Sequence, residues 1–149
     1  MRDNTTMLAI RTIVLTFISI LLSACNSEIP IEPKPVNIIQ LQHHWELTHI
    51  DNIRLATVIN SSLIIDDDYN SFGNLGCNNF RGEVQVNNNK LNITNMGKSL
   101  KHCSEIQNSV EKDVISVLRG TANIMVDNRT LIISNDQHSL TYYLAKESI

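Results

Sequence analysis

Three cysteines, Cys25, Cys77 and Cys103, are the residues of this 149-residue chain best suited to covalent chemistry. A thiol can carry a lipid, pair in a disulfide, or act as a nucleophile when its environment favours the thiolate. Cys103 directly precedes a predicted helix, whose N-terminal N–H groups favour a negative charge. His102 is adjacent, but neighbouring residues of an extended segment point in opposite directions, so it is poorly placed as a base. A thiol-dependent enzyme using Cys77 or Cys103 stays open as an alternative.

The remaining polar residues do not predict a metal site. Asp66, Asp68 and Asn70 alternate like the start of a calcium-binding EF-hand loop. However, Ser71 occupies the position of the sharp-turn glycine, and Cys77 occupies that of the bidentate glutamate. The five histidines form no His-x-x-x-His pair, and the cysteines form no Cys-x-x-Cys pair. We therefore expect no metal and no cofactor.

The N-terminal segment predicts export. The first eleven residues carry two basic residues, Arg2 and Arg11. Residues 12–22 then form an apolar run that is typical of a signal peptide and too short to span a bilayer. Its end, Leu22-Ser23-Ala24-Cys25, resembles the lipobox of bacterial lipoproteins. The resemblance implies that residues 1–24 are a lipoprotein signal peptide and that Cys25 is the lipid attachment site, carrying acyl chains such as palmitate. The alternative is an ordinary secretory signal with an incidental cysteine.

The residues after Cys25 indicate where such a protein would reside. Two or three acyl chains hold a protein on a membrane, whereas one chain binds only marginally. Asn26 follows the cysteine, and lipoproteins of this type without Asp at that position usually reach the outer membrane. We therefore expect a lipid-anchored protein of the cell envelope, at the periplasmic face of the outer membrane. Residues 25–41 hold all three prolines, which favours a lipidated, extended tether ahead of a domain at 42–149.

Charge limits the partners. The chain has a formal net charge of −3 at pH 7, and its basic residues form no cluster. Nucleic-acid binding draws most of its affinity from cations that neutralise phosphates, so we expect no nucleic-acid partner. The expected partners are the membrane, through the N-terminal lipid, and a protein or hydrophobic ligand.

Short segments with alternating apolar and polar residues predict β-strands from about residue 42 onward. The loop between Val86 and Leu91 and the turn at Asp127-Asn128 predict hairpins. The predicted strands lie at 45–48, 63–65, 83–86, 91–94, 124–126, 130–134 and 140–144.

One segment has helical periodicity instead. Ser104 and Gln107 form a Ser-x-x-Gln capping box, and Gly120 ends the pattern. Between them an apolar stripe is formed by Ile106, Val110, Val114, Val117 and Leu118, with Ile115 pointing away from it. The predicted fold class is α+β: a curved antiparallel sheet, resembling half a barrel, packed against one main α-helix.

Two cysteines remain once Cys25 is assigned to lipid. In an oxidising periplasm, Cys77 and Cys103 are most simply paired in a disulfide. Closing this loop would stabilise the fold by about 3.5 kcal/mol in the chain-entropy model. The bond would tie the glycine-rich stretch at 73–82 to the start of the predicted helix.

That stretch also carries a family resemblance. Trp45-Glu46-Leu47, the run GNLGCNNFRG at 73–82, and Leu91-Asn92-Ile93 leading to Cys103 resemble the META domain of HslJ-like bacterial proteins over about residues 42–146. The chain departs at residues 99–103, SLKHC, where the family more often has Thr-x-Met-Ala-Cys. The residues that match the family motif are Trp45, Gly73, Gly76, Asn78, Phe80 and Gly82.

The motif also has a physical interpretation. Three of the five glycines fall within residues 73–82, which predicts a turn with close backbone approach. We expect Trp45 and Phe80 to be core residues, and the motif to be structural.

The resemblance implies a noncatalytic module associated with heat-shock expression and envelope stress, including tolerance of novobiocin. It also implies a fold similar to that of lipid-binding pilot lipoproteins of secretion systems. We therefore expect an outer-membrane-anchored, noncatalytic lipoprotein that binds a protein or hydrophobic partner. A structural stress lipoprotein without any ligand is the further alternative.

Overall fold

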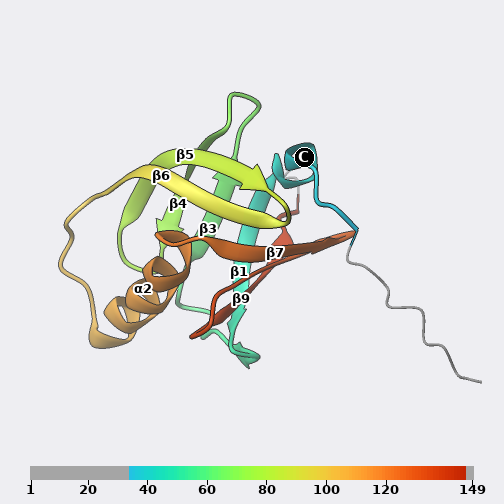
Figure 1. The fold of residues 1–149 in the computed structure, drawn as a ribbon. Helices are drawn as coiled ribbons and strands as arrows, with labels where there is room; N and C mark the ends of the chain where they lie inside the picture. Colours follow the sequence, from blue (N-terminus) through green and yellow to red (C-terminus); the bar gives the residue numbers. More distant parts are fainter. Residues whose placement is uncertain (1–33, 147–149) are drawn as a thin grey trace, which may run out of the picture. The chain divides into compact units, whose positions relative to one another are not determined.

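Nine strands, one 3-10 helix and one α-helix are formed by residues 34–146, the part of the chain that the computed structural model describes (Figure 1). In chain order they are η1 (Ile38–Leu41), β1 (His44–Ile50), β2 (Ile53–Arg54), β3 (Ser61–Ile65), β4 (Asn70–Leu75), β5 (Asn79–Asn87), β6 (Lys90–Lys98), α2 (Glu105–Leu118), β7 (Ala122–Asp127), β8 (Thr130–Ser134) and β9 (Ser139–Leu144). The predicted lipid attachment site Cys25, with the predicted signal peptide and the start of the tether, lies outside the described residues.

The strands form an antiparallel barrel. The sheet order is β2-β1-β3-β4-β5-β6-β7-β8-β9, and β1 also pairs with β9, which closes the ring. Strand β2 pairs only with the end of β1, so it extends the barrel wall as a short hairpin. The predicted antiparallel sheet with a helix is confirmed, but the sheet closes further than a half-barrel. The pairing of β1 with β9 satisfies backbone groups that these two strands would leave free in an open sheet.

Asparagines make the tight turns that the sequence predicts. Asn88 and Asn89 join β5 to β6 with φ angles of 49° and 57°, and Asn128 follows β7 with a φ of 47°. A two-residue hairpin loop needs positive φ at both residues in a type I′ turn and at the first residue in a type II′ turn, and asparagine tolerates positive φ better than most residues. The predicted hairpins at 86–91 and after Asp127 are therefore confirmed.

Helix α2 begins at the predicted capping box. The Ser104 hydroxyl accepts a hydrogen bond from the backbone N–H of Gln107, whose side chain reaches back to the Ser104 backbone. The apolar stripe differs from the prediction at two positions. Ile106 is 54% exposed, whereas Ile115 is partly buried against the core. The buried face thus starts at Val110 rather than in the first turn.

The barrel interior is filled with apolar side chains. Trp45 is fully buried and donates its indole N–H to the carbonyl of Leu41 at 2.9 Å. Leu41 is itself fully buried at the end of η1, and Ile38 packs against the core, although residues 38–41 were assigned above to the tether. The folded unit starts at Lys34, earlier than residue 42. Among the described residues, no helix is long and apolar enough to cross a membrane.

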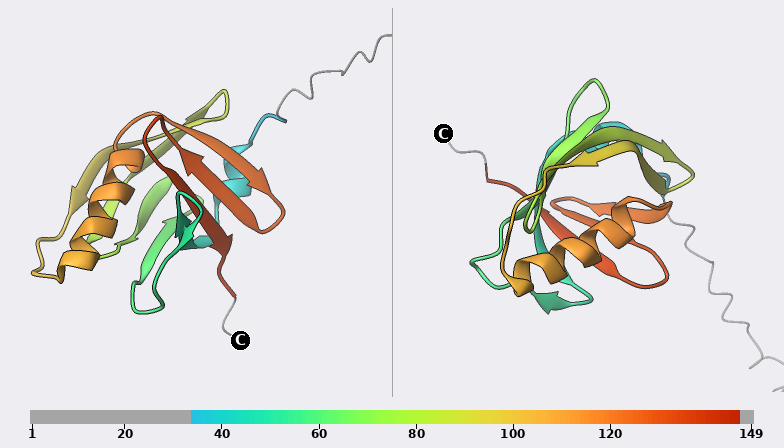
Figure 2. Two further views of the ribbon diagram at one scale, coloured as in Figure 1. Left: turned by 90° about the horizontal axis from the view of Figure 1, so that it is seen from below. Right: turned by 90° about the vertical axis from the view of Figure 1, so that its left-hand side faces the viewer.

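The shortest strand pairing within the barrel is that between β6 and β7. Only Lys90 and Leu91 of β6 pair with β7, through Asn123 and Ala122. The connection between these strands includes α2, which crosses in front of the barrel in the right-hand view (Figure 2). The helix contacts β4 and β9. One end of the barrel is therefore covered by the buried face of α2.

Candidate functional site

The stretch at 73–82 is mostly strand rather than turn. Gly73 lies in β4 and Gly82 in β5, so the connection consists only of residues 76–78. Gly76 has a φ of 109°, and a Cβ atom there would lie 2.7 Å from Cγ1 of Val110 on α2. Glycine is thus required at residue 76, both for the backbone angle and for the approach of the helix.

The predicted disulfide between Cys77 and Cys103 is confirmed. Their Cα atoms are 5.9 Å apart, across a sequence separation of 26 residues. The bond joins the 76–78 turn to the segment before α2. Both sulfur atoms that the sequence offered as nucleophiles are bonded to each other.

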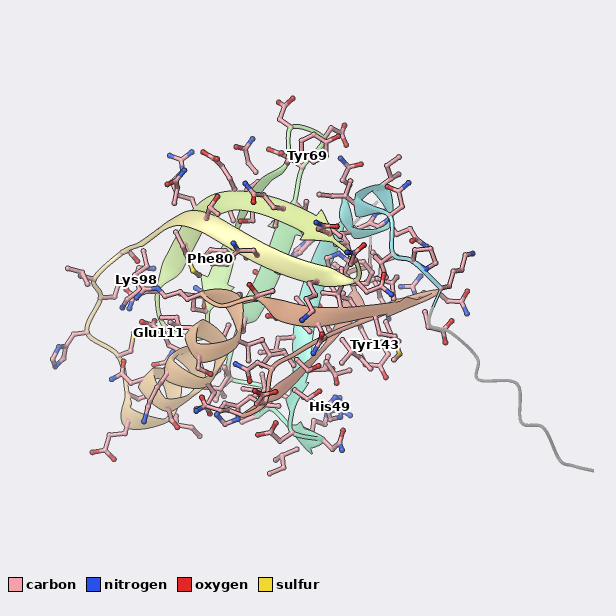
Figure 3. The ribbon with its side chains drawn as sticks, viewed as in Figure 1. His49, Tyr69, Phe80, Lys98, Glu111 and Tyr143 are labelled. Carbon is pink, nitrogen blue, oxygen red and sulfur yellow. A yellow bond between two sulfur atoms is a disulfide. The ribbon has the colours of Figure 1, made fainter. Side chains whose placement is uncertain are left out.

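A polar cluster lies beside the disulfide and consists of the buried Asn78 and Glu111 and the partly buried Lys98. The Glu111 carboxylate is 2.6 Å from Nζ of Lys98 and accepts the backbone N–H of Asn78 at 2.8 Å. The Asn78 side-chain amide donates to the same carboxylate at 2.9 Å. Lys98 and Glu111 lie close together between β6 and α2 (Figure 3). The cluster therefore joins three elements: the 76–78 turn, β6 and α2.

The Glu111 carboxyl is ionised in this environment. Burial by itself raises its pKa, but hydrogen bonds from Lys98 and from Asn78 act in the opposite direction and outweigh burial. The net effect is a pKa below the ordinary value of 4.5. A carboxylate with a lowered pKa stays charged near neutral pH and accepts a proton weakly. Glu111 therefore serves to hold its hydrogen-bond partners in place.

The carbonyl oxygen of the Asn78 side chain holds the segment that leads to α2. It accepts the Lys101 backbone N–H at 2.6 Å and the Ser99 hydroxyl at 3.0 Å. Asn78 is 4% exposed, and every polar atom of its side chain has a partner. The side chain thus fixes the course of residues 99–101.

The other motif residues are also structural. Trp45 and Phe80 are 0% and 4% exposed, as predicted for core residues. Gly82 lies on β5 opposite a bulge in β6, and a Cβ atom there would be 2.6 Å from Cγ2 of Ile93. A Cβ on Gly73 would overlap the carbonyl oxygen of Ser62. The motif is therefore a packing motif.

Sequence reasoning missed Lys98 and Glu111. The spacing along the helix indicates the position of Glu111. Val114 and Leu118 follow it by three and seven residues, so Glu111 lies on the same buried helix face as these apolar residues. No sequence pattern indicates the role of Lys98 at the end of β6, because its partner Glu111 lies on a different element, α2.

A second polar cluster, formed by His138, Asp51 and Asp113, joins two turns and the helix. Nδ1 of His138 is 2.7 Å from Oδ2 of Asp51, and Nε2 is 3.7 Å from Oδ1 of Asp113. Asp51 also accepts the Ser139 backbone N–H at 2.7 Å. The hydrogen bond with His138 has the largest effect on Asp51 and lowers its pKa, and the bond from the Ser139 backbone acts in the same direction. The contact joins the β1–β2 turn to the β8–β9 turn.

The acidic run at 66–68 is a turn. Oδ1 of Asp66 accepts the backbone N–H groups of Asp68 at 3.0 Å and Asn70 at 2.8 Å. These bonds lower the pKa of Asp66, with the Asn70 side chain making the largest contribution. Within residues 34–146 no group of three or more His, Cys, Asp or Glu side chains is arranged to hold a metal ion.

Two hollows open on the outer surface along β5 and β6. One has a volume of about 360 Å³ and is lined by Asn79, Phe80, Arg81, Gly97 and Lys98. The other has a volume of about 330 Å³ and is lined by Gln85, Asn87, Asn88, Lys90, Asn92 and Thr121. Both border β6.

A closed antiparallel barrel with one covering helix and a disulfide-tied glycine motif defines a class of small β-barrel domains. The chain belongs to the META domain family, whose pattern it matches over residues 38–147. This match confirms the resemblance found in the sequence. No curated protein matches the chain.

Solved structures share the fold. A protein determined by NMR superimposes with a TM-score of 0.65 at 20% identity, covering 73% of this chain and 95% of the other. A Burkholderia xenovorans protein, also from NMR, gives 0.60 at 17% identity, with 83% and 98% covered. A crystal structure of a DUF4847-family protein from Bacteroides vulgatus gives 0.52 at 10% identity, with 74% and 97% covered. At these identities the likeness is one of fold.

Proposed function

We propose that this protein is a noncatalytic, lipid-anchored module of the cell envelope that presents its META domain to a protein partner. In this proposal Cys25 carries the lipid, residues 26–33 separate the domain from the membrane, and the periplasmic face of the outer membrane is the site of residence. Envelope stress is the proposed setting.

The observation that carries the noncatalytic part is the bond between Cys77 and Cys103. A thiol-dependent enzyme requires a free, acidic sulfur, and each of these sulfurs is held by the other. The polar groups beside them are also engaged, since Glu111 is paired with Lys98 and bonded by Asn78. The motif therefore supports the fold rather than a reaction.

A protein partner is favoured over a hydrophobic ligand inside the barrel. Trp45, Tyr142 and Leu118 are at most 1% exposed, and they fill the interior and the face beneath α2. Large apolar side chains on the outside include Phe72, which is 40% exposed on β4, and Tyr143, which is 45% exposed on β9. Exposed aromatic residues are enriched where proteins bind one another.

Metabolic labelling tests the anchoring. The full chain is expressed in a bacterium with two membranes, in medium containing an alkyne analogue of palmitate. We expect the wild-type protein to take up the label and to sediment with the outer membrane, and the Cys25→Ser variant to do neither. The double variant Cys77→Ser/Cys103→Ser is the matched control, because it removes thiols elsewhere and should keep the label. Label on the Cys25→Ser variant, or none on the wild type, would refute lipid anchoring.

A further inference from the structure

Strand β6 has an open edge. It pairs with β5 along most of its length, but β7 covers only Lys90 and Leu91. From Asn92 to Lys98 no second strand lies beside it within the described part of the chain. Alternate N–H and C=O groups of a strand point away from its partner, so this edge offers free backbone donors and acceptors.

The open edge lacks the usual chemical protection. Natural edge strands commonly carry charges or proline, which discourage another strand from pairing. Residues 92–97, NITNMG, contain neither. A bulge at Asn95, whose φ is 53°, bends the strand but leaves the residues on both sides of it extended.

The two surface hollows lie at the two ends of this edge. One is bordered by Lys90 and Asn92, and the other by Gly97 and Lys98. Residues 92 and 97 are roughly 17 Å apart along an extended strand. A single added strand of about six residues would therefore reach both hollows with its side chains.

The hollow at Gly97 has the chemistry to hold an aromatic ring. Phe72, Arg81 and Gly97 are register partners on three adjacent strands. Gly97 has no side chain, and a Cβ there would meet no atom within 4 Å. An aromatic residue on a strand added beside β6 could lie across this glycine, a pairing known to stabilise glycine-containing strands. The ring would then meet the exposed Arg81, whose guanidinium binds aromatic faces.

Charge favours acidic residues in the added strand. Lys90 and Lys101 are exposed at the two ends of the edge, and neither forms an ion pair within residues 34–146. Lys98 differs, since it is paired with Glu111. Carboxylates at both ends of a bound segment would therefore face free ammonium groups.

We propose that the open edge of β6 binds an extended segment of a partner protein, which adds to the barrel as a further strand. The segment places an aromatic side chain over Gly97 and Arg81 and acidic residues near Lys90 and Lys101. This inference rests on the partner-binding part of the proposed function and is independent of the lipid anchor.

The test uses the secreted full chain with Cys25→Ser, labelled with ¹⁵N, and the synthetic peptide ETVTYTVTVTVE with blocked ends, whose tyrosine and two terminal acids have the spacing of Gly97, Lys101 and Lys90 along the chain. We expect saturable chemical-shift changes and slower amide exchange at residues 92–98. Replacing the peptide tyrosine with serine should weaken binding at least several-fold. Arg81→Ala should weaken binding of the tyrosine peptide by about two- to fivefold, the range of an exposed cation–π contact. Gly97→Phe, which fills the hollow from within, should abolish the tyrosine effect.

The matched control is Tyr69→Ser, which removes an exposed aromatic residue from the turn before β4 and should leave peptide binding unchanged. The proposal is overturned if millimolar peptide leaves residues 92–98 unperturbed, or if the changes appear instead at β2. Concentration-dependent changes at residues 92–98 without peptide would assign the edge to a second copy of the chain and would also overturn it. Neither result affects palmitate labelling at Cys25, so failure of the anchor and failure of this inference are distinguishable.

Discussion

Glu111 shows how one buried charge can be stable in a small domain. Its side chain is 9% exposed, and Lys98 and Asn78 together satisfy the carboxylate. Removing one partner of such a cluster leaves other buried polar groups without partners, which costs more than the average hydrogen bond contributes.

We predict that Glu111→Gln lowers the free energy of unfolding by about 1–3 kcal/mol at pH 7. The folded-state pKa of Glu111 is lowered, so its contribution is complete above its unfolded value of 4.5 and is lost as the pH falls through the folded pKa. The difference between wild type and variant should therefore shrink below pH 4.5. Urea unfolding at pH 7 and pH 3 measures it.

Glu46→Gln is the matched control, because Glu46 is an exposed carboxylate on β1. It should change stability by no more than about 0.5 kcal/mol at either pH. A constant difference between wild type and Glu111→Gln across this pH range would contradict the role given to the ionised carboxylate.

A second prediction for a single residue concerns the effect of replacing Gly76 on stability. Gly76→Ala should destabilise the domain by about 1–3 kcal/mol, because the added Cβ meets Val110 and the φ of 109° strains any side chain. Adding Val110→Ala should not restore stability, since the backbone strain remains and a cavity is created. Gly97→Ala, where the Cβ meets nothing, is the control. Thermal unfolding distinguishes them, and equal melting temperatures for the two alanine variants would contradict the close approach.

At the scale of elements, α2 was the most predictable part of the chain. Its start at Ser104 and its end before Gly120 follow from local capping and spacing. Its exposed and buried faces were less predictable, because the position of a helix on a barrel depends on distant contacts. Ile106 is exposed since the first turn precedes the buried face, which begins at Val110.

The disulfide should contribute strongly to the placement of α2. It joins the 76–78 turn to the residues that lead into the helix. We predict that Cys77→Ser/Cys103→Ser lowers the free energy of unfolding by about 3.5 kcal/mol, from the loop-closure entropy of a 26-residue separation. Urea unfolding of oxidised wild type and the double variant measures this. A loss below about 1 kcal/mol would show that the Asn78 and Glu111 cluster holds the segment without the bond.

At the scale of the whole molecule, the sequence predicted most strands but not the closure. Alternation identifies a strand and its buried face, yet it does not name the partner. The closing pair joins residues 44–50 to residues 139–144, almost the full length of the domain. Strand β4 was also hidden, because its glycine, Gly73, and its asparagines resemble a turn. The burial of Leu41 and its hydrogen bond with Trp45 were not predictable, because the prolines upstream suggest an extended tether.

A closed barrel should unfold as one unit, because every strand of the ring depends on two neighbours. Trp45 is fully buried and is the only tryptophan of the chain, so its fluorescence reports the core. We predict that fluorescence and far-ultraviolet circular dichroism give coincident urea midpoints. Separate midpoints would mean that α2 or the β5–β6 hairpin unfolds independently of the barrel.

Counting free thiols tests most directly whether the cysteines of the domain are structural. The Cys25→Ser protein is purified from the periplasm, denatured, and labelled with maleimide with and without prior reduction. We predict no labelled thiol before reduction and two after it, at Cys77 and Cys103. A free thiol at either position before reduction would contradict the noncatalytic function proposed here and would make the cysteine enzyme the alternative to pursue.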